Sequence, residues 1–292
     1  MAARMNSEHN TTKSYKLPIK HLFFFIKYYY TLGHKEKNFI ILNSIHKSGT
    51  TYFRLIFANY LKLYYEKITT CITYKQMQSN IIPNERDGCF FKKNRQYIDP
   101  ADKVVKNTKY QDLIYGHSYK FLEYCQGKIV SLHRNPLDVI ISRYFYSWAY
   151  RAEKENPYSS PSDVIDLVLD KYIKHYNFMR SLAVRKQNIL RISYEMLITD
   201  PYITFNIVLN WLNIPINIAS LRQAIEFADI KNVRLEEERD GKAIHSPDGY
   251  KGFFTRSGKI GQWKEYFSEE DFAYIVTKLE KNDIDIGEFI IE

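Results

Sequence analysis

Short apolar runs alternate with longer amphipathic stretches along most of this chain. The apolar runs are typical of buried strands and cover residues 39–42, 113–118, 128–133 and 188–193. Stretches with helical spacing of apolar residues cover residues 50–66, 137–151, 160–185, 202–212, 218–227 and 268–281. Because strands alternate with helices, the sequence predicts an α/β fold with a mostly parallel central sheet flanked by helices.

The segments outside these elements suggest the limits of the domain. Residues 1–16 are polar and are expected to form a mobile N-terminus, which leaves residues 17–292 as a single domain. Residues 67–109 contain scattered turns with weak periodicity, and we interpret them as an insertion or a wrapping loop. Residues 231–261 are predicted to be a charged loop that contains glycine.

Composition and charge restrict the partners of the chain. A chain of 292 residues, 45% hydrophobic and 26% charged, can bury a substantial core. Its formal net charge of +9 fits a polyanionic ligand, a nucleic acid or an acidic membrane equally well. The chain has no block of five or more like charges, which weakens the nucleic-acid and membrane interpretations. We therefore expect small-molecule partners, bound by a monomer or a homodimer.

The cysteines and the apolar runs indicate a compartment. Cys71, Cys89 and Cys125 lack paired spacing, which favours a reducing compartment and argues against a zinc site. The apolar run at residues 21–32 is interrupted by Lys27 and is too short to span a bilayer. Without a signal-peptide pattern, the sequence predicts a cytoplasmic protein with no transmembrane segment and no metal.

Candidate chemistry begins directly after the first predicted strand. A polar loop with one glycine, Gly49, separates this strand from a helix that is predicted to start at Thr50. A strand, a tight loop and a helix N-terminus form an anion site, because backbone N–H groups there lack partners and the helix dipole favours negative charge. Lys47 adds a cation, and Thr50 and Thr51 add hydroxyl donors. The stretch favours phosphate or sulfate binding, although by itself it could also be a plain turn.

Two later stretches carry further groups that suit phosphate. Arg134 ends a predicted strand, and Ser142 lies two turns into the following helix. A guanidinium binds phosphate in bidentate fashion, although an isolated arginine more often pairs with a carboxylate. The basic stretch at residues 256–264 contains Gly258 and Gly261 and could clamp an anion or form a surface turn.

Four motifs in this order resemble those of the cytosolic-type sulfotransferases that use 3′-phosphoadenosine 5′-phosphosulfate (PAPS). Residues 46–52 are similar to their 5′-phosphosulfate loop, Pro-Lys-Ser-Gly-Thr-Thr-Trp, with His46 for Pro and Tyr52 for Trp. Residues 134–142 are similar to their 3′-phosphate motif, Arg-Asn-Pro-x-Asp-x-x-x-Ser. Residues 194–197 match Tyr-Glu-x-Leu, and residues 256–264 are similar to Arg-Lys-Gly-x-x-Gly-x-Trp-Lys, with Ser257 for Lys.

The resemblance implies a P-loop-like fold and assigns roles to the matching residues. It implies that PAPS is the co-substrate and that adenosine 3′,5′-bisphosphate (PAP) is the product. The 5′-phosphosulfate would bind the loop and the helix start, and the 3′-phosphate and the adenosine would bind the other motifs. The implied cofactor-binding residues are Lys47, Ser48, Gly49, Thr50, Thr51, Tyr52, Arg134, Ser142, Tyr194, Phe227, Arg256, Ser257 and Gly258.

The resemblance also implies a mechanism. Lys47 would neutralise the leaving group, and His117 would take the proton of an acceptor hydroxyl or amine. Ser142 would contact Lys47 before the acceptor binds. Two other hypotheses stay open. A P-loop nucleotide kinase or NTPase is disfavoured, because Lys47 precedes the only glycine of the loop and a Walker A motif is missing. A non-catalytic PAP-binding module is the second.

Overall fold

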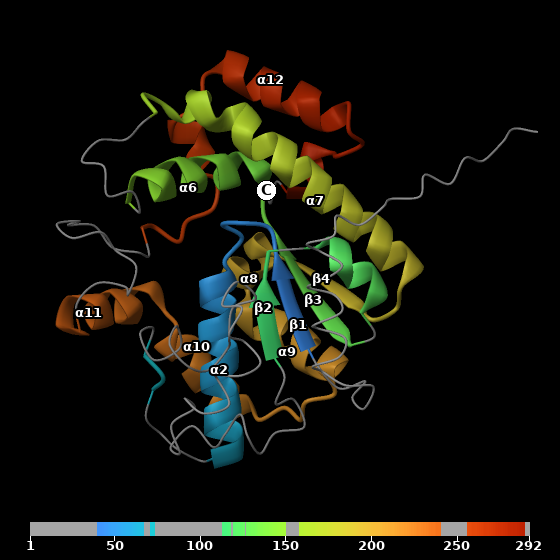
Figure 1. Cartoon of the computed structure of the whole chain (residues 1–292). Coiled ribbons are helices and arrows are strands. Elements are labelled where there is room, and N and C mark those ends of the chain that lie inside the picture. Colours follow the sequence, from blue (N-terminus) through green and yellow to red (C-terminus); the bar gives the residue numbers. More distant parts are fainter. Residues whose placement is uncertain are drawn as a thin grey trace, which may run out of the picture. The chain divides into compact units, whose positions relative to one another are not determined.

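Four parallel strands form the centre of the fold (Figure 1). The computed structural model describes residues 40–66, 71–73, 113–117, 119–125, 127–149, 158–240 and 256–289. The strands are β1 (Ile40–Ser44), β2 (Leu113–Gly116), β3 (Lys128–His133) and β4 (Ile189–Ser193), in the sheet order β2-β1-β3-β4. Each pair of neighbouring strands is parallel, as the alternation of strands and helices predicted.

The helices follow the strands along the chain. They are α2 (Thr50–Glu66), α6 (Pro136–Ala149), α7 (Ile165–Arg185), α8 (Tyr194–Thr199), α9 (Pro201–Leu212), α10 (Ile218–Phe227), α11 (Ile230–Asp240) and α12 (Glu269–Glu280). Short 3₁₀ turns lie at η3 (Lys120–Tyr124), η4 (Pro161–Val164), η5 (Gln262–Glu265) and η6 (Ile286–Phe289).

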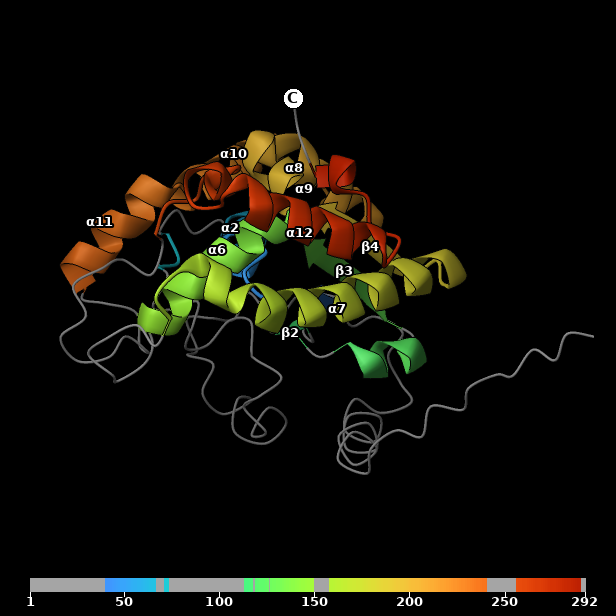
Figure 2. The same ribbon diagram turned by 90° about the horizontal axis from the view of Figure 1, so that it is seen from above.

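The sheet is covered on both faces, because the side chains of a strand alternate between them. Ile40 and Leu42 of β1 pack into a cluster with α2, α8, α9 and α10. Ile45, which follows β1, packs into a second cluster with α6, α7 and α12. Figure 2 shows β3 between α7 on one side and α8 and α9 on the other. A strand that is buried on both faces explains why β1 reads as an uninterrupted apolar run.

The strand order concentrates four chain segments at one edge. β1 lies between β2 and β3, so the connections that leave β1 and β3 cover opposite faces of the sheet. In a parallel sheet the carboxyl ends of all strands meet at the same edge, where such a switch point opens a crevice. The segments that begin at Ile45, His117, Arg134 and Tyr194 all start at this edge.

Two sequence expectations about elements differ from the structure. The loop predicted at residues 231–261 is wrong for its first part, which forms α11. Asp229 starts this helix: its carboxylate accepts the N–H of Lys231 (2.8 Å) and its carbonyl accepts the N–H of Val233 (3.0 Å). The helix predicted at 160–185 begins with the turn η4 before α7. Ser268 caps α12, with a capping box to Asp271.

Several expectations lie outside the described residues. They concern the mobile segment 1–16, the domain boundary at residue 17, most of the insertion at 67–109 and residues 241–255 of the predicted loop. Within the described part of the chain, no helix is long and apolar enough to cross a membrane.

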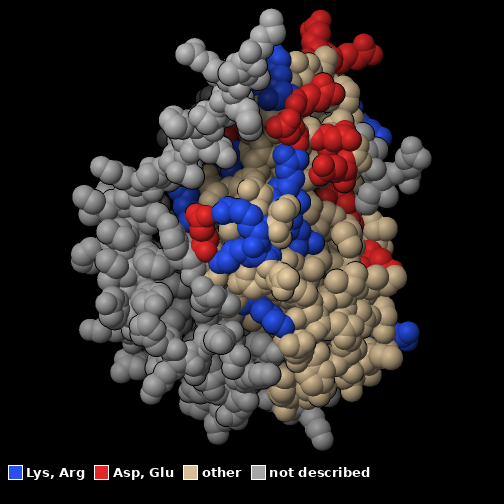
Figure 3. Space-filling model, turned by 90° about the vertical axis from the view of Figure 1, so that its right-hand side faces the viewer, with Lys and Arg blue, Asp and Glu red and all other residues tan. Residues whose placement is uncertain are grey.

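The face in Figure 3 carries both signs of charge. Lys and Arg side chains gather near its centre, beside a row of Asp and Glu side chains. In the described part, Lys278 pairs with Asp166 (2.6 Å) and Asp170 (2.7 Å) across α12 and α7. This side of the molecule is therefore not a continuous basic surface.

Candidate active site

The loop after β1 is folded tightly against Tyr194. Lys47 and Gly49 both have positive φ, 70° and 79°. A Cβ atom added to Gly49 would lie 2.4 Å from Cδ2 of Tyr194, closer than any real contact. Glycine is therefore required at this position for two reasons, the backbone conformation and the approach of the Tyr194 ring.

This loop presents hydrogen-bond donors to an anion. The loop leads directly into α2, whose first N–H groups have no partners within the helix. The Ser48 hydroxyl is buried and has no hydrogen-bond partner among the described residues. A buried hydroxyl without a partner is costly, so it marks a place where a ligand oxygen fits. The donor set of the loop therefore suits a phosphate or a sulfonate.

Lys47 lies among other cations. Its Nζ atom is 4.1 Å from the ring centroid of Tyr146 on α6. Desolvation, together with the positive charges of Arg134, Arg143 and Arg256, lowers the pKa of Lys47 from 10.5 to about 7. Four basic side chains gathered in this way repel one another. An anion bound among them would relieve the repulsion.

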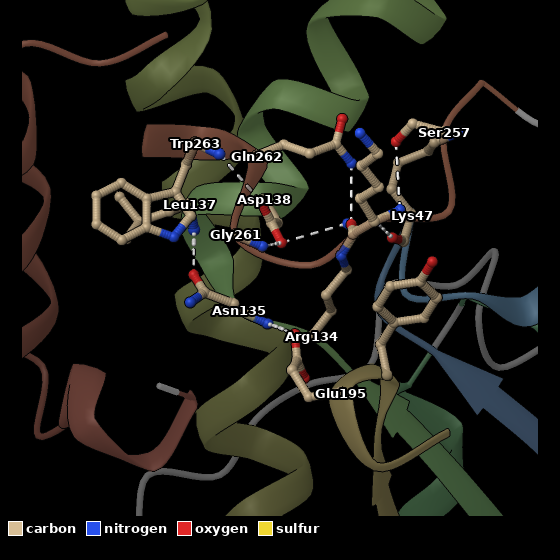
Figure 4. Close-up of polar contacts among 12 residues, drawn as sticks. Lys47, Arg134, Asn135, Leu137, Asp138, Glu195, Ser257, Gly261, Gln262 and Trp263 are labelled. Atoms are coloured by element: carbon tan, nitrogen blue, oxygen red, sulfur yellow. Dashed lines mark hydrogen bonds and ion pairs between the residues drawn. The ribbon is translucent and has the colours of Figure 1, made fainter. Parts of the chain in front are cut away.

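Arg134 is held by the segments on each side of it (Figure 4). Its side chain is buried, with 5% exposure, and lies 4.2 Å above the ring of Tyr194. Nη1 donates to the carbonyl oxygen of Lys47 (3.3 Å), and Nη2 donates to the carbonyl oxygen of Lys259 (2.9 Å). Nε is buried without a partner in the described residues. A guanidinium with a donor to spare fits an anion at this point.

The basic C-terminal segment reaches the same place. The hydroxyl of Tyr194 donates to the carbonyl oxygen of Gly258 (2.9 Å). The guanidinium of Arg256 lies 4.2 Å above the ring of Phe145 and donates to Gln262. The hydroxyl oxygen of Ser257 accepts the N–H of Lys259 (3.3 Å), which shapes the turn. The segment that carries Arg256, Ser257 and Gly258 thus lies beside Arg134, and its role as an anion clamp stays a prediction.

Helix α6 turns one face toward both basic segments. Asp138 on this face contacts the C-terminal segment, and Tyr146 contacts Lys47. Ser142 lies four residues from each, so all three share one helix face. The Ser142 side chain is half-buried, and it makes no hydrogen bond to another described residue. Its position agrees with a role at the anion site.

His117 follows β2 at the same sheet edge, next to β1. Its Nδ1 atom is 2.8 Å from the carbonyl oxygen of Ser44 and 3.1 Å from the Ser44 hydroxyl. The Ser44 hydroxyl also bonds the Thr50 hydroxyl (2.6 Å), which links His117 to the start of α2. The ring of His46 packs against that of His117, with 3.7 Å between the centroids and an angle of 32° between the planes.

Comparison with known proteins identifies the family. The pattern of the Sulfotransferase domain matches residues 37–281, which is most of the chain. The chain belongs to the sulfotransferase family.

Its sequence relatives are distant sulfotransferases. Cytosolic sulfotransferase 15 of Arabidopsis thaliana is 22% identical over 253 residues, which cover 80% of this chain and 68% of that protein. Cytosolic sulfotransferase 7 of the same plant is 26% identical over 161 residues, 49% of this chain and 47% of that protein. The 3-beta-hydroxysteroid sulfotransferase of Cavia porcellus is 23% identical over 148 residues, 49% and 51% of the two chains. The matches to the last two span about half of each relative.

Solved structures share the sulfotransferase fold. Retinol dehydratase in complex with androsterone and inactive cofactor PAP has a TM-score of 0.60 and 17% identity, over 86% of this chain and 82% of that chain. The mouse sulfotransferase SULT7A1 complexed with PAP has a TM-score of 0.56 and 17% identity, over 88% and 90%. These likenesses confirm the predicted fold class.

Some of the predicted site residues of this sulfotransferase-family chain lie together, and others lie apart from them. Lys47, Arg134, Tyr194 and the 256–258 segment lie together, as described above. Tyr52 and Phe227 are half-buried against the α2 side of the core, where both pack on the same cluster. Burial raises the pKa of the Tyr52 hydroxyl to about 12, with smaller contributions from Asp229 and Tyr194, so the hydroxyl stays protonated. A role of Tyr52 and Phe227 in stacking on a base remains a prediction.

Sequence reasoning missed residues that support the site. Glu195 accepts the N–H of Asn135 (2.9 Å) and so fixes the turn that follows β3. Burial raises the pKa of the Glu195 carboxyl. Asp138 binds the C-terminal segment, and Tyr146 covers Lys47. Asp138 and Glu195 lie inside matched motifs, but the backbone N–H groups that they accept are more than 50 residues away, which no local pattern reveals. In the described residues, no cluster of His, Cys, Asp and Glu suits a metal ion.

Proposed function

We propose that this protein is a PAPS-dependent sulfotransferase that transfers a sulfuryl group to a hydroxyl or an amine of a small molecule. The observation that carries the proposal is the set of cations around Lys47, with its lowered pKa, at a loop rich in hydrogen-bond donors. Arg134 and Arg256 on one side and the loop after β1 on the other would hold the two phosphate groups of the nucleotide.

The chemistry depends on the charge that develops during transfer. When bound, PAPS supplies the sulfuryl group and PAP is the leaving group. Lys47 would donate a proton or a hydrogen bond to the bridging oxygen of the 5′-phosphate as the S–O bond breaks. Burial desolvates this amine and the neighbouring arginines repel its positive charge, and a bound polyanion would restore the charge. Lys47 would therefore be most strongly charged when the donor is present.

His117 is the proposed base, and its tautomer supports this role. A carbonyl oxygen only accepts, so the short contact to Ser44 requires Nδ1 of His117 to carry the proton. In the neutral ring, Nε2 then has the lone pair and can accept a proton. During transfer, Nε2 would take the proton of the acceptor hydroxyl while the new O–S bond forms. Ser142, on the α6 face between Asp138 and Tyr146, would contact Lys47 before the acceptor binds.

The acceptor is proposed only as a class. Androsterone and retinol appear with PAP in the structures of retinol dehydratase, and a relative is named as a 3-beta-hydroxysteroid sulfotransferase. These names support a hydroxyl on an apolar skeleton, and an amine acceptor stays open. We also propose a cytoplasmic location, in line with two relatives named as cytosolic sulfotransferases.

The test measures nucleotide binding first and transfer second. Calorimetry should detect tight binding of PAP and at least about tenfold weaker binding of ATP. Transfer from radiolabelled PAPS to a panel of phenols, steroids and amines should follow, and it should be lost in Lys47→Ala. Preference for ATP would contradict the proposal in favour of a nucleotide kinase. Tight PAP binding with no transfer to any acceptor would favour a non-catalytic PAP-binding module.

A further inference from the structure

Asp138 joins three parts of the site that come from different regions of the chain. Its side chain is 1% exposed and lies in the first turn of α6. Oδ2 accepts the N–H of Gly261 (2.8 Å) and a bond from Nη2 of Arg134 (3.4 Å), and Oδ1 accepts the N–H of Trp263 (3.2 Å). Figure 4 shows this carboxylate between Arg134 and the C-terminal segment. Both carboxylate oxygens are therefore in use.

These contacts orient the guanidinium of Arg134. Nη2 is held by Asp138 and by the carbonyl oxygen of Lys259, while Nη1 is held by the carbonyl oxygen of Lys47. These three hydrogen bonds hold the two terminal nitrogens, and the ring of Tyr194 lies against the guanidinium plane. Nε has no hydrogen-bond partner among the described residues. Asp138 thus restricts the direction in which Arg134 can offer its remaining donors.

The same carboxylate fixes the segment that carries Arg256. Gly261 is held with φ 75°, which directs its N–H to Asp138. Gln262, the next residue, donates to the carbonyl oxygen of Lys259 (2.9 Å) and accepts from Arg256. The side chain of Gln262 therefore links the anchored backbone at Gly261 to the guanidinium of Arg256. Without Asp138, the backbone of this segment would lose its hydrogen bonds from Gly261 and Trp263 to α6.

We propose that Asp138 is a positioning residue that holds Arg134 and residues 256–263 in one arrangement and so sets the preference of the site for a nucleotide with a 3′-phosphate. This inference rests on the proposed function. Asp138 touches neither the nucleotide nor the acceptor; it acts through Arg134 and Arg256. A general loss of folding stability would weaken the binding of every ligand. The loss of a positioning residue weakens only the binding that depends on the 3′-phosphate.

The test compares PAP with adenosine 5′-phosphate, which lacks the 3′-phosphate. In Asp138→Asn one oxygen becomes an NH₂ group, which faces a backbone N–H and removes the negative charge opposite Arg134. The preference for PAP is the dissociation constant of adenosine 5′-phosphate divided by that of PAP, both measured by calorimetry. We expect this ratio to fall at least about tenfold in the variant. Affinity for adenosine 5′-phosphate should change little, and Asp138→Glu should recover part of the ratio.

A control variant separates this effect from the loss of any aspartate that accepts backbone N–H groups, here at the exposed Asp163. Asp163 also accepts two backbone N–H groups, those of Ser159 (2.8 Å) and Ser160 (3.0 Å), but in η4 rather than at the site. Asp163→Asn should leave the ratio unchanged. If Asp138→Asn does not fold, Gly261→Ala tests the same hydrogen bond from its donor side, the N–H of Gly261. Its Cβ would meet no atom within 4 Å, so only the positive φ is disfavoured, and the ratio should fall about fivefold.

The outcomes distinguish this inference from the proposed function. Equal binding of both nucleotides by the unaltered protein would overturn the proposed function and this inference with it. A clear preference for PAP that persists in Asp138→Asn, or in Gly261→Ala where that variant carries the test, would overturn the role of Asp138 alone. Parallel loss of affinity for both nucleotides would also overturn it, because that result indicates a general structural role.

Discussion

The two halves of the candidate site are built in different ways. The nucleotide half consists of Arg134, Asp138, Tyr194 and residues 256–263. Its first three residues are buried, and hydrogen bonds join them to residues 256–263. In the transfer half, His117 is fixed through Ser44 and packs against the exposed His46, and residues 74–112, which precede its strand, lie outside the described residues. Affinity should therefore depend on the first half and the chemical step on the second.

The largest expected effect comes from the base in the transfer half. His117→Ala should lower the transfer rate at saturating PAPS by about 10²–10⁴-fold, because a general base contributes that much. PAP affinity should stay within about threefold, since Nδ1 of this side chain bonds Ser44, which lies outside the nucleotide half. Steady-state kinetics and calorimetry measure the two quantities. His46→Phe is the matched control: it keeps a ring beside His117 and should retain most of the rate. Full activity in His117→Ala would remove the assignment of the base.

A substitution at the junction should damage both halves. Gly49→Ala places a Cβ 2.4 Å from the Tyr194 ring at φ 79°, so the loop or the ring must move. We expect a loss of about 2–4 kcal/mol in the free energy of unfolding and weaker PAP binding. Denaturant unfolding measures the first effect. Gly287→Ala, whose Cβ would meet only the side chain of Asp285 at 3.2 Å, should be nearly neutral. Equal stability of the two variants would contradict the packing argument.

The nucleotide half was largely predictable from local sequence. The loop at Lys47 and the turn at Arg134 each follow a strand of apolar residues, and a parallel sheet brings such strand ends to one edge. Local order along the chain is enough to predict that these groups converge. Helix α11 was missed for the opposite reason. Its residues favour a helix but are mostly charged, so no apolar stripe marks the element.

The connections within the site could not be predicted. Asp138 looks like an ordinary residue of the first turn of a helix, where negative charge is favourable. Its two backbone partners lie more than 120 residues later. The contact between the rings of His46 and His117 likewise joins two strand ends whose separation depends on the sheet order. Contacts of this kind depend on the assembled sheet, and no periodicity in the sequence records them.

A conservative change can sharpen the contrast between the halves. Arg134→Lys keeps the charge but loses the planar group that lies over Tyr194 and bonds two carbonyl oxygens. We expect PAP to bind about tenfold more weakly, while the transfer rate at saturating PAPS changes less than about threefold. Arg180→Lys, at a half-buried arginine of α7, serves as the control. A drop in the saturated rate with unchanged affinity would show that the halves are not separable.

The smallest expected effect is the uptake of a proton by Lys47 when PAP binds. Its pKa is lowered to about 7 in the free protein, so the unfolded chain binds more protons between about pH 7 and 10.5. Stability should therefore rise with pH across this window. Bound PAP would raise the pKa again, so binding should take up about half a proton at pH 7 and close to one at pH 8.5. PAP affinity should accordingly fall as the pH rises above 7.

Calorimetry in buffers of different ionisation enthalpy measures this uptake directly. Lys47→Met is the appropriate variant, because it keeps an unbranched chain under Tyr146 and has no proton to exchange. The pH dependence of PAP binding should flatten above pH 7 in this variant, while the buried Arg134 still supports binding. Unchanged uptake in Lys47→Met would place the proton on another group. It would then separate the nucleotide half from the lysine that we propose acts on the leaving group.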